Sequence, residues 1–340
     1  MNRPIDCRST RRFGVEIELN TFDGIIKRAD SDNGIIPEGS DCIANIVKKN
    51  SNERVEICCW DHYHNNSNWI IKHDMSCGIE INTPVFKGWH GLKTLLQVVE
   101  ALSKNSQVTS NQLCSLHVHV GVSDLSLRQI ASVIAHYIKC EHIFFDSVPS
   151  QRKNNRYCHL VGLTDWFDTS FDMDASEIIN RVSQAKYASI NAYHFMRSGG
   201  LIGEDSRATI EFRIAENKAC LDPYYVKNWV RFLIHFVETM SCRKIPQPYN
   251  GNPKTGLVWL DFQDVYSLLR FDEELSLGMQ QVRQWFMDRI FVNGQDNLES
   301  NNIWSSVARK IAREQFLELN NKLTRIDDAE DGLYGEKWIA

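Results

Sequence analysis

Residues 12–20 read RFGVEIELN, a stretch in which apolar and charged side chains alternate, and this alternation predicts a β-strand. Successive side chains of a strand point to opposite faces, so Glu16 and Glu18 share one face while Val15 and Ile17 share the other. Two carboxylates on one face can bind a divalent cation, because Mg²⁺ and Ca²⁺ prefer oxygen ligands. For a single pair of this kind, a solvated strand face remains the plainer interpretation.

Two further stretches repeat this spacing. In LHVHV, residues 116–120, His117 and His119 share a strand face, and imidazoles can ligate a metal or contact phosphate. In TIEFR, residues 209–213, the Glu211 carboxylate can bind metal and the Arg213 guanidinium can hold a phosphate or carboxylate through two hydrogen bonds. Each pair alone also fits an ordinary surface strand, as partly exposed histidines or as ion pairs with neighbouring strands.

A fourth stretch, KHDMSCGIEINTP at residues 72–84, ends at a proline and places Glu80 between two isoleucines. Glu80 is therefore expected to project from the polar face of a strand, as the other acids do. Asp74 and Ser76 are instead typical of a capped turn. Clustered carboxylates repel one another unless cations or arginines compensate them. The four stretches together predict one polar sheet face lined by acids, histidines and an arginine.

The rest of the chain indicates an α+β protein with a helical C-terminal part. Residues 21–52 are polar, contain several glycines, and are expected to form a long excursion or an irregular hairpin. Further strands are predicted at 53–60, 68–73, 77–83, 114–122 and 207–215. Helices are predicted at 88–104, 126–147, 174–187, 223–242 and over most of 261–323. We expect a catalytic region at 1–220 and a mainly helical region at 221–340, packed on the same domain.

Composition limits the class of protein. With 43% hydrophobic and 24% charged residues and a net charge of -5, the chain has no global basic field for nucleic acid. It has no apolar run long enough to cross a membrane and no apolar core of a signal peptide near its start, so a cytoplasmic location is expected. Cys58, Cys59, His62 and His64 have a spacing that matches no standard structural zinc site.

At this point the motifs resemble the amidoligase family, part of the glutamine synthetase-like superfamily of carboxylate–amine ligases. The resemblance is carried in order by FGVEIEL (13–19), the region 63–69 running into IIKHDMSCGIEINTP (70–84), LHVHVG (116–121), PSQRKNNRYC (149–158), KYASIN (186–191) and TIEFR (209–213). It covers residues 13–215 and leaves the helical last third without a motif. After TIEFR the family usually continues towards an Asn-Gly pair, whereas this chain has Ala215-Glu216-Asn217-Lys218.

The resemblance implies an antiparallel sheet whose concave face holds ATP and two or three Mg²⁺ or Mn²⁺ ions. It implies that Glu18 and Glu80 hold one ion and that Glu16, His117 and Glu211 hold another. Arg213 would steady the γ-phosphate and the acyl phosphate, Arg152 is a second phosphate-binding candidate, and His119 is a nucleotide-contact candidate. Lys186, Tyr187 and Asn191 would lie near substrate or nucleotide. The implied catalytic residues are therefore Glu80, Glu211 and Arg213.

The implied activity is ATP-dependent amide formation from a carboxylate substrate and an amine substrate, through an acyl phosphate. Two alternatives stay open. One is a metal-dependent phosphotransferase on the same fold, which would phosphorylate an acceptor without forming an amide. The other is a non-catalytic binding module that retains the scaffold. The motifs do not identify the acid or the amine.

Overall fold

The computed structural model describes residues 10–21, 39–58, 67–74, 76–153, 155–161, 174–193, 195, 208–246, 262–273 and 275–299. Three predicted features lie wholly or partly outside these ranges: residues 22–38 of the predicted excursion at 21–52, the cysteine and histidine group from Cys59 onward, and the predicted helical stretch beyond residue 299.

A single large sheet is built around β1 (Arg12–Thr21). The strand order is β2 (Val55–Cys58), β3 (Trp69–Asp74), β4 (Gly78–Asn82), β1, β7 (Leu116–Gly121), β9 (Thr209–Phe212) and β8 (Ile190–Asn191). The short strands β5 (Phe86–Lys87) and β6 (Val108–Thr109) pair with the two ends of β1. Among the described strands every pairing is antiparallel except that of β2 with β3. The α+β class with an antiparallel sheet is thereby confirmed.

The described chain also forms helices on either side of these strands in the sequence. They are α1 (Ser40–Ser51), α2 (Gly88–Ser103), α3 (Leu127–Asp146), α4 (Ser150–Lys153), α5 (Ala175–Gln184), the 3₁₀ helix η2 (Asn217–Leu221), α7 (Pro223–Ser241), α8 (Phe262–Leu268) and α9 (Leu277–Glu299). Side chains cap the starts of three of these helices. Ser126 and Gln129 form a capping box on α3, and the Asp174 and Asp222 carboxylates cap α5 and α7.

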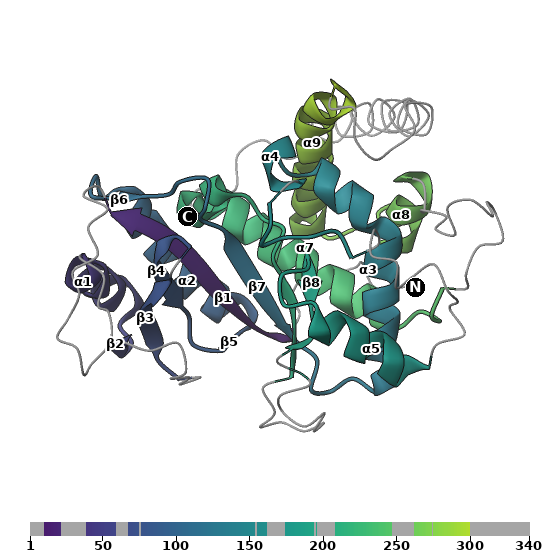
Figure 1. Ribbon diagram of the computed structural model, residues 1–340, viewed down its shortest axis with the longest axis horizontal. Helices are drawn as coiled ribbons and strands as arrows, with labels where there is room; N and C mark the ends of the chain where they lie inside the picture. Colours follow the sequence, from purple (N-terminus) through teal and green to yellow (C-terminus); the bar gives the residue numbers. More distant parts are fainter. Residues whose placement is uncertain are drawn as a thin grey trace.

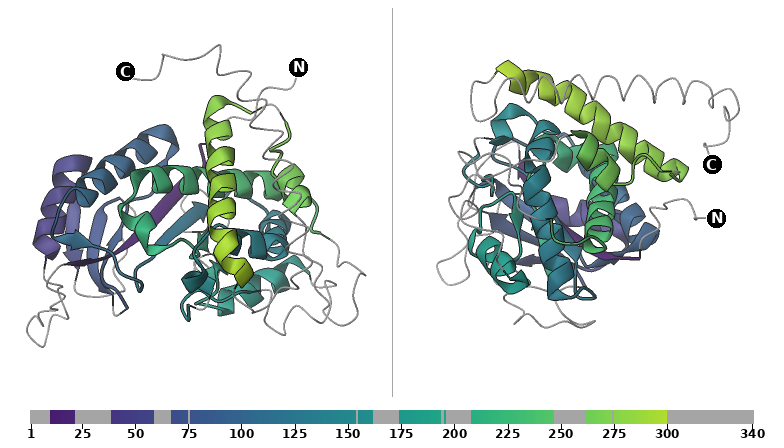
Figure 2. Two further views of the ribbon diagram at one scale, coloured as in Figure 1. Left: turned by 90° about the horizontal axis from the view of Figure 1, so that it is seen from above. Right: turned by 90° about the vertical axis from the view of Figure 1, so that its right-hand side faces the viewer.

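One face of the sheet is covered by helices. The apolar side chains of β1, among them Val15 and Ile17, are buried in a continuous core that also contains residues of α2, α3, α7 and α9. Helices α2 and α7 contact each other and lie on the same side of the sheet (Figures 1 and 2). The charged side chains of β1 therefore project from the opposite face.

The prediction for residues 40–51 was wrong, because this segment forms α1 rather than an irregular excursion. Ile43 and Val47 are one helical turn apart and both are fully buried, which anchors the helix against α2. Gly39 at the start and Asn52 at the end adopt left-handed conformations (φ 89° and 56°) that stop the helix at both ends. Two buried apolar positions in a polar stretch are a weak periodic signal.

No helix in the described part of the chain combines the length and apolar character that a membrane span requires.

Candidate active site

The register of the sheet brings the predicted polar residues into adjacent positions on one face. In antiparallel neighbours, directly opposed residues project to the same side. Glu18 of β1 is opposite Glu80 of β4, which in turn is opposite Lys72 of β3. On the other side of β1, Glu16 is opposite His117 of β7, and His119 is opposite Glu211 of β9. Period-2 spacing within each strand therefore becomes a two-dimensional polar patch.

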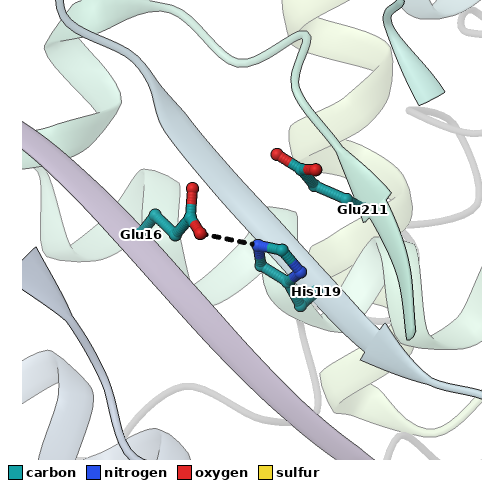
Figure 3. A group of neighbouring side chains, drawn as sticks. All are labelled: Glu16, His119 and Glu211. Atoms are coloured by element: carbon teal, nitrogen blue, oxygen red, sulfur yellow. Dashed lines mark ion pairs between the residues drawn. The ribbon is translucent and has the colours of Figure 1, made fainter. Parts of the chain in front are cut away.

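The first half of this patch is formed by Glu16, His119 and Glu211. These side chains extend from three neighbouring strands toward one another (Figure 3), and each offers one ligand atom within 4.8 Å of the others. His119 Nε2 lies 3.2 Å from Glu16 Oε1. One imidazole and two carboxylates form a donor set that suits Mg²⁺ or Mn²⁺, with the imidazole favouring the latter.

His117 lies between the two halves of the patch. Its Nδ1 donates to Glu16 Oε2 at 2.9 Å and lies 3.5 Å from Glu211 Oε1. Its Nε2 is 3.5 Å from Glu18 Oε1. The ring is buried, so both of its nitrogen atoms face carboxyl groups of the patch and not solvent.

The second half of the patch contains Glu18 and Glu80, both buried, with the Lys72 ammonium 3.0 Å from Glu80 Oε1. Glu18, Asp74 and Cys77 form a second group whose possible ligand atoms lie within 4.8 Å of one another. Asp74 also caps the turn before β4, as the sequence predicted, because its Oδ1 accepts from the backbone N–H groups of Ser76 (2.7 Å) and Cys77 (3.1 Å).

The two halves differ in charge balance. Burial raises the pKa of Glu16, but the His119 charge and hydrogen bonds from both histidines outweigh it and hold that pKa well below its usual value. Burial likewise opposes ionisation of Glu211, yet the Arg213 guanidinium lowers its pKa. Burial lowers the pKa of His119, but the Glu16 carboxylate reverses the effect and the net shift is upward. The first half is thus internally compensated.

The second half lacks this compensation. Burial and the Glu80 charge raise the pKa of Glu18 well above its usual value. Burial and the Glu16 charge raise the pKa of Glu80 to about 8 despite the Lys72 ammonium. Two buried carboxyl groups with raised pKa values need a nearby positive charge before both can ionise. A divalent cation bound between them would supply that charge. The residues present therefore fit a metal ion on this face.

Arg213 lies at the edge of the patch, where its Nη1 donates to Glu211 Oε1 at 2.5 Å. Its Nε is 3.4 Å from the carbonyl oxygen of Tyr157. The Tyr157 ring meets the Tyr187 ring edge-on, with centroids 5.4 Å apart, and the Lys186 ammonium lies 5.5 Å from the centre of the Tyr187 ring. Lys186 sits in the turn after α5, which ends at Gln184 and not at the predicted residue 187.

Arg152 occupies a different environment from the other candidates. Its guanidinium is buried, and it donates to the carbonyl oxygen of Arg213 at 2.8 Å and to the Ser115 hydroxyl at 2.9 Å. Asn191 stands opposite Glu211 in the sheet, and its amide nitrogen donates to the carbonyl oxygen of Lys186 at 3.0 Å. It thereby ties the Lys186 turn to the strand next to the polar patch.

Sequence reasoning missed the cationic partner of the patch. Lys72 is buried against Glu80, although it lies within a stretch that was singled out for its acids. The parity of β3 was a usable signal, since Lys72 and Asp74 fall on one face of that strand. Cys77, which contributes to the second group, was not considered as a ligand; it lies in the turn before β4 and not in the strand predicted from residue 77.

Comparison with known proteins gives one family match. A family model described as "Putative amidoligase enzyme" matches residues 9–237. No protein of curated function matches the chain in sequence.

Several solved structures resemble this one at low identity. One described as a novel glutamine synthase homolog has 10% identity and a TM-score of 0.42, over 90% of this chain and 71% of the other. Glutamate–cysteine ligase from Francisella tularensis, in complex with AMP, has 9% identity and a TM-score of 0.38, over 93% and 84%. A bifunctional glutathione synthetase from Pasteurella multocida has 11% identity and a TM-score of 0.39, over 92% of this chain and about half (52%) of the other.

The family match includes every strand of the sheet that carries the polar patch. Because it extends over more than half of the chain, this protein belongs to the amidoligase family.

Proposed function

We propose that the protein is a carboxylate–amine ligase that uses ATP and divalent metal ions, Mg²⁺ or Mn²⁺, to form an amide bond. The observation that carries this proposal is the two-part polar face. One half holds Glu16, His119 and Glu211 within ligand distance of one another, and the other holds two buried carboxyl groups with raised pKa values. A solvated surface strand would leave the Glu18 and Glu80 carboxyl groups exposed, whereas both are buried.

Two metal positions follow from the donor groups. Glu16, Glu211 and His119 would hold one ion, and Glu18 and Glu80 a second, with Asp74 beside them. The family resemblance assigns His117, and not His119, to the first ion. His117 lies 2.9 Å from Glu16, close enough to the proposed ion to be the alternative ligand. Bound metal ions would neutralise charge on the β- and γ-phosphates of ATP.

Arg213 would hold the phosphoryl group in transfer. Its guanidinium is largely buried and already oriented by Glu211, so it can stabilise negative charge with little rearrangement. The substrate carboxylate would attack the γ-phosphorus, forming an acyl phosphate and releasing ADP. The amine would then attack the acyl carbon, lose a proton and expel phosphate. The protein mainly positions the reactants.

The tyrosine pair beside Arg213 is the proposed place for nucleotide or substrate contact. The Tyr157 carbonyl meets Arg213, and its ring meets that of Tyr187, which is exposed and flanked by Lys186. An exposed aromatic ring with an adjacent ammonium group suits a ligand that has both a flat ring and a negative charge.

The deciding assay measures ADP release with Mg²⁺ across panels of carboxylates and amines. Release that needs both an acid and an amine, with loss of activity in Glu211→Gln, supports the ligase. Glu100→Gln serves as the control, since Glu100 is an exposed glutamate of α2 that pairs with Lys104. A phosphorylated acceptor without an amide would indicate a phosphotransferase. If the wild-type protein does not bind ATP, both enzymatic functions are excluded.

A further inference from the structure

The backbone that leaves β9 has its own set of hydrogen-bond partners. The strand ends at Phe212, and Arg213 N–H then donates to the carbonyl oxygen of Ser189 at 2.9 Å. The carbonyl groups of Arg213, Ile214 and Ala215 fall beyond the β7–β9 ladder. Buried carbonyl groups need partners, so the position of this segment depends on what binds them.

Arg152 and Ser115 supply those partners. Arg152 Nη2 donates to Arg213 O at 2.8 Å and to Ser115 Oγ at 2.9 Å, and its Nε lies 3.4 Å from Ile214 O. The Ser115 hydroxyl lies 3.1 Å from Ala215 O and can donate its proton there. Three consecutive carbonyl groups are therefore held by one guanidinium and the hydroxyl bonded to it.

This arrangement uses most of the hydrogen-bonding capacity of Arg152. Three of its five N–H groups are directed at protein acceptors, and the side chain is only 6% exposed. Among the described residues Arg152 forms no salt bridge with a carboxylate, so its charge is balanced mainly by carbonyl dipoles. Lysine could not replace it, because an ammonium group lacks the planar fork that reaches several acceptors at once.

We propose that Arg152 is a positioning residue: with Ser115 it fixes the backbone exit of β9 and thereby the aim of Glu211 and Arg213. Its effect on turnover rests on the proposed ligase function, whereas the restraint on the backbone does not. The position differs from that of a phosphate-binding arginine, which would keep its N–H groups directed at the ligand. Glu211 lies only two residues before the first restrained carbonyl group. Motion of the backbone at residues 213–215 would therefore displace the side chains of Glu211 and Arg213.

The test compares Arg152→Lys and Ser115→Ala with two controls on exposed helix surfaces, Arg181→Lys and Ser103→Ala. Hydrogen exchange is measured on peptides that contain residues 213–216 and, for reference, residues of β1 and β4. Affinity for a non-hydrolysable ATP analogue with Mg²⁺ is measured by calorimetry. Turnover with ATP is measured under saturating substrate.

Both test variants are expected to raise exchange at 213–216 by about tenfold while β1 and β4 keep their protection. Turnover should fall about tenfold or more in Arg152→Lys, with the affinity for the analogue changed less than about threefold. Ser115→Ala should show a smaller fall of the same kind, and the double variant should be little worse than Arg152→Lys because the two groups act as one unit.

Two results would overturn the proposal. Unchanged exchange at 213–216 in both variants would show that the restraint does not exist. Loss of analogue affinity in Arg152→Lys with normal turnover and affinity in Ser115→Ala would make Arg152 a phosphate ligand. If the wild-type protein neither binds nor uses ATP, the ligase proposal fails, while hydrogen exchange still decides whether Arg152 holds the segment.

Discussion

His117 and His119 occupy equivalent strand positions but differ in what surrounds them. His119 Nε2 belongs to the group of ligand atoms with Glu16 and Glu211, whereas His117 Nδ1 is already bonded to Glu16. We therefore predict that His119→Gln weakens Mn²⁺ binding about a hundredfold and His117→Gln about tenfold, as expected for a ligand and for a group that orients one. Electron paramagnetic resonance titration of free Mn²⁺ measures both. The reverse order would assign the ion to His117.

Lys72 supplies a positive charge to the half of the patch that contains Glu18 and Glu80. Replacing it by methionine keeps the buried chain and removes the charge beside Glu80, with Glu18 opposite. We predict that Lys72→Met lowers the free energy of unfolding by about 2 kcal/mol in EDTA, because a buried carboxyl group loses its partner. Mn²⁺ should shrink this difference, since the ion replaces the lost charge. Lys104→Met, which breaks an exposed pair with Glu100, should change little under either condition.

At the residue scale, much of the candidate site was readable from strand parity. Glu16 and Glu18, or Glu211 and Arg213, share a face because side chains alternate along any strand. What joins them is the register between strands, which depends on contacts made far apart in sequence. Two contacts depend on such long-range pairing: that of Lys72 with Glu80, and that of buried Arg152 with the backbone that follows β9.

At the scale of elements, long periodic helices were predicted closely and short or weakly patterned ones were not. The helix α3 was expected at 126–147 and spans Leu127–Asp146, because its apolar stripe and capping box agree. The helix α1 was missed, since only Ile43 and Val47 mark its buried side. The parallel pairing of β2 with β3 was also not foreseen, because nothing within either strand specifies the direction of its neighbour.

The helix α9 lies outside the family match yet reaches the segment that follows β9. Arg289 of α9 pairs with the buried Glu216, donates to Ser147 O at 3.1 Å and stacks over the Tyr225 ring. Truncation to alanine would leave Glu216 buried without this partner. We predict that Arg289→Ala lowers the free energy of unfolding by about 3 kcal/mol, measured in urea. Arg181→Ala, which breaks an exposed pair on α5, should cost less than about 0.5 kcal/mol.

At the scale of the whole molecule, one apolar core connects the sheet to the C-terminal helices. Phe144 of α3 contacts Phe232 and Phe236 of α7 and Phe286 of α9. The helix α7 in turn packs on β7, the strand that carries both site histidines. The α+β class was predictable because strand and helix patterns segregate along the chain. The way α7 packs on the sheet and α9 packs on α3 and α7 was not, because contacts between aromatic side chains of different helices leave no period in the sequence.

A buried histidine in this core makes the stability of the fold depend on pH. His235 of α7 donates Nε2–H to Leu269 O at 2.8 Å, and its ring stacks on Phe271. Burial lowers the pKa of His235, with the Arg270 charge acting in the same direction and the hydrogen bond to Leu269 and the Glu238 carboxylate opposing it. The unfolded chain, where the imidazole pKa is about 6.5, therefore binds a proton at a higher pH than the folded chain does. Stability contributed by neutral His235 is present above about pH 6.5 and is lost as pH falls below it.

We predict that the free energy of unfolding falls more steeply from pH 7 to pH 5 in the wild type than in His235→Gln, with a difference in slope of up to about 1.4 kcal/mol per pH unit, the limit for one proton. Glutamine retains an N–H donor for Leu269 but cannot be protonated in this range, so the comparison isolates the charge. His136, whose pKa burial also lowers, contributes to the slope in both proteins, and Glu18 and Glu80, whose pKa values are raised, oppose it in both. His90→Gln, at an exposed position of α2, is the matched control and should leave the wild-type slope in place. Urea unfolding at several pH values measures the slopes, and equal slopes for His235→Gln and the wild type would show that the ring is protonated as easily in the fold as in the unfolded chain.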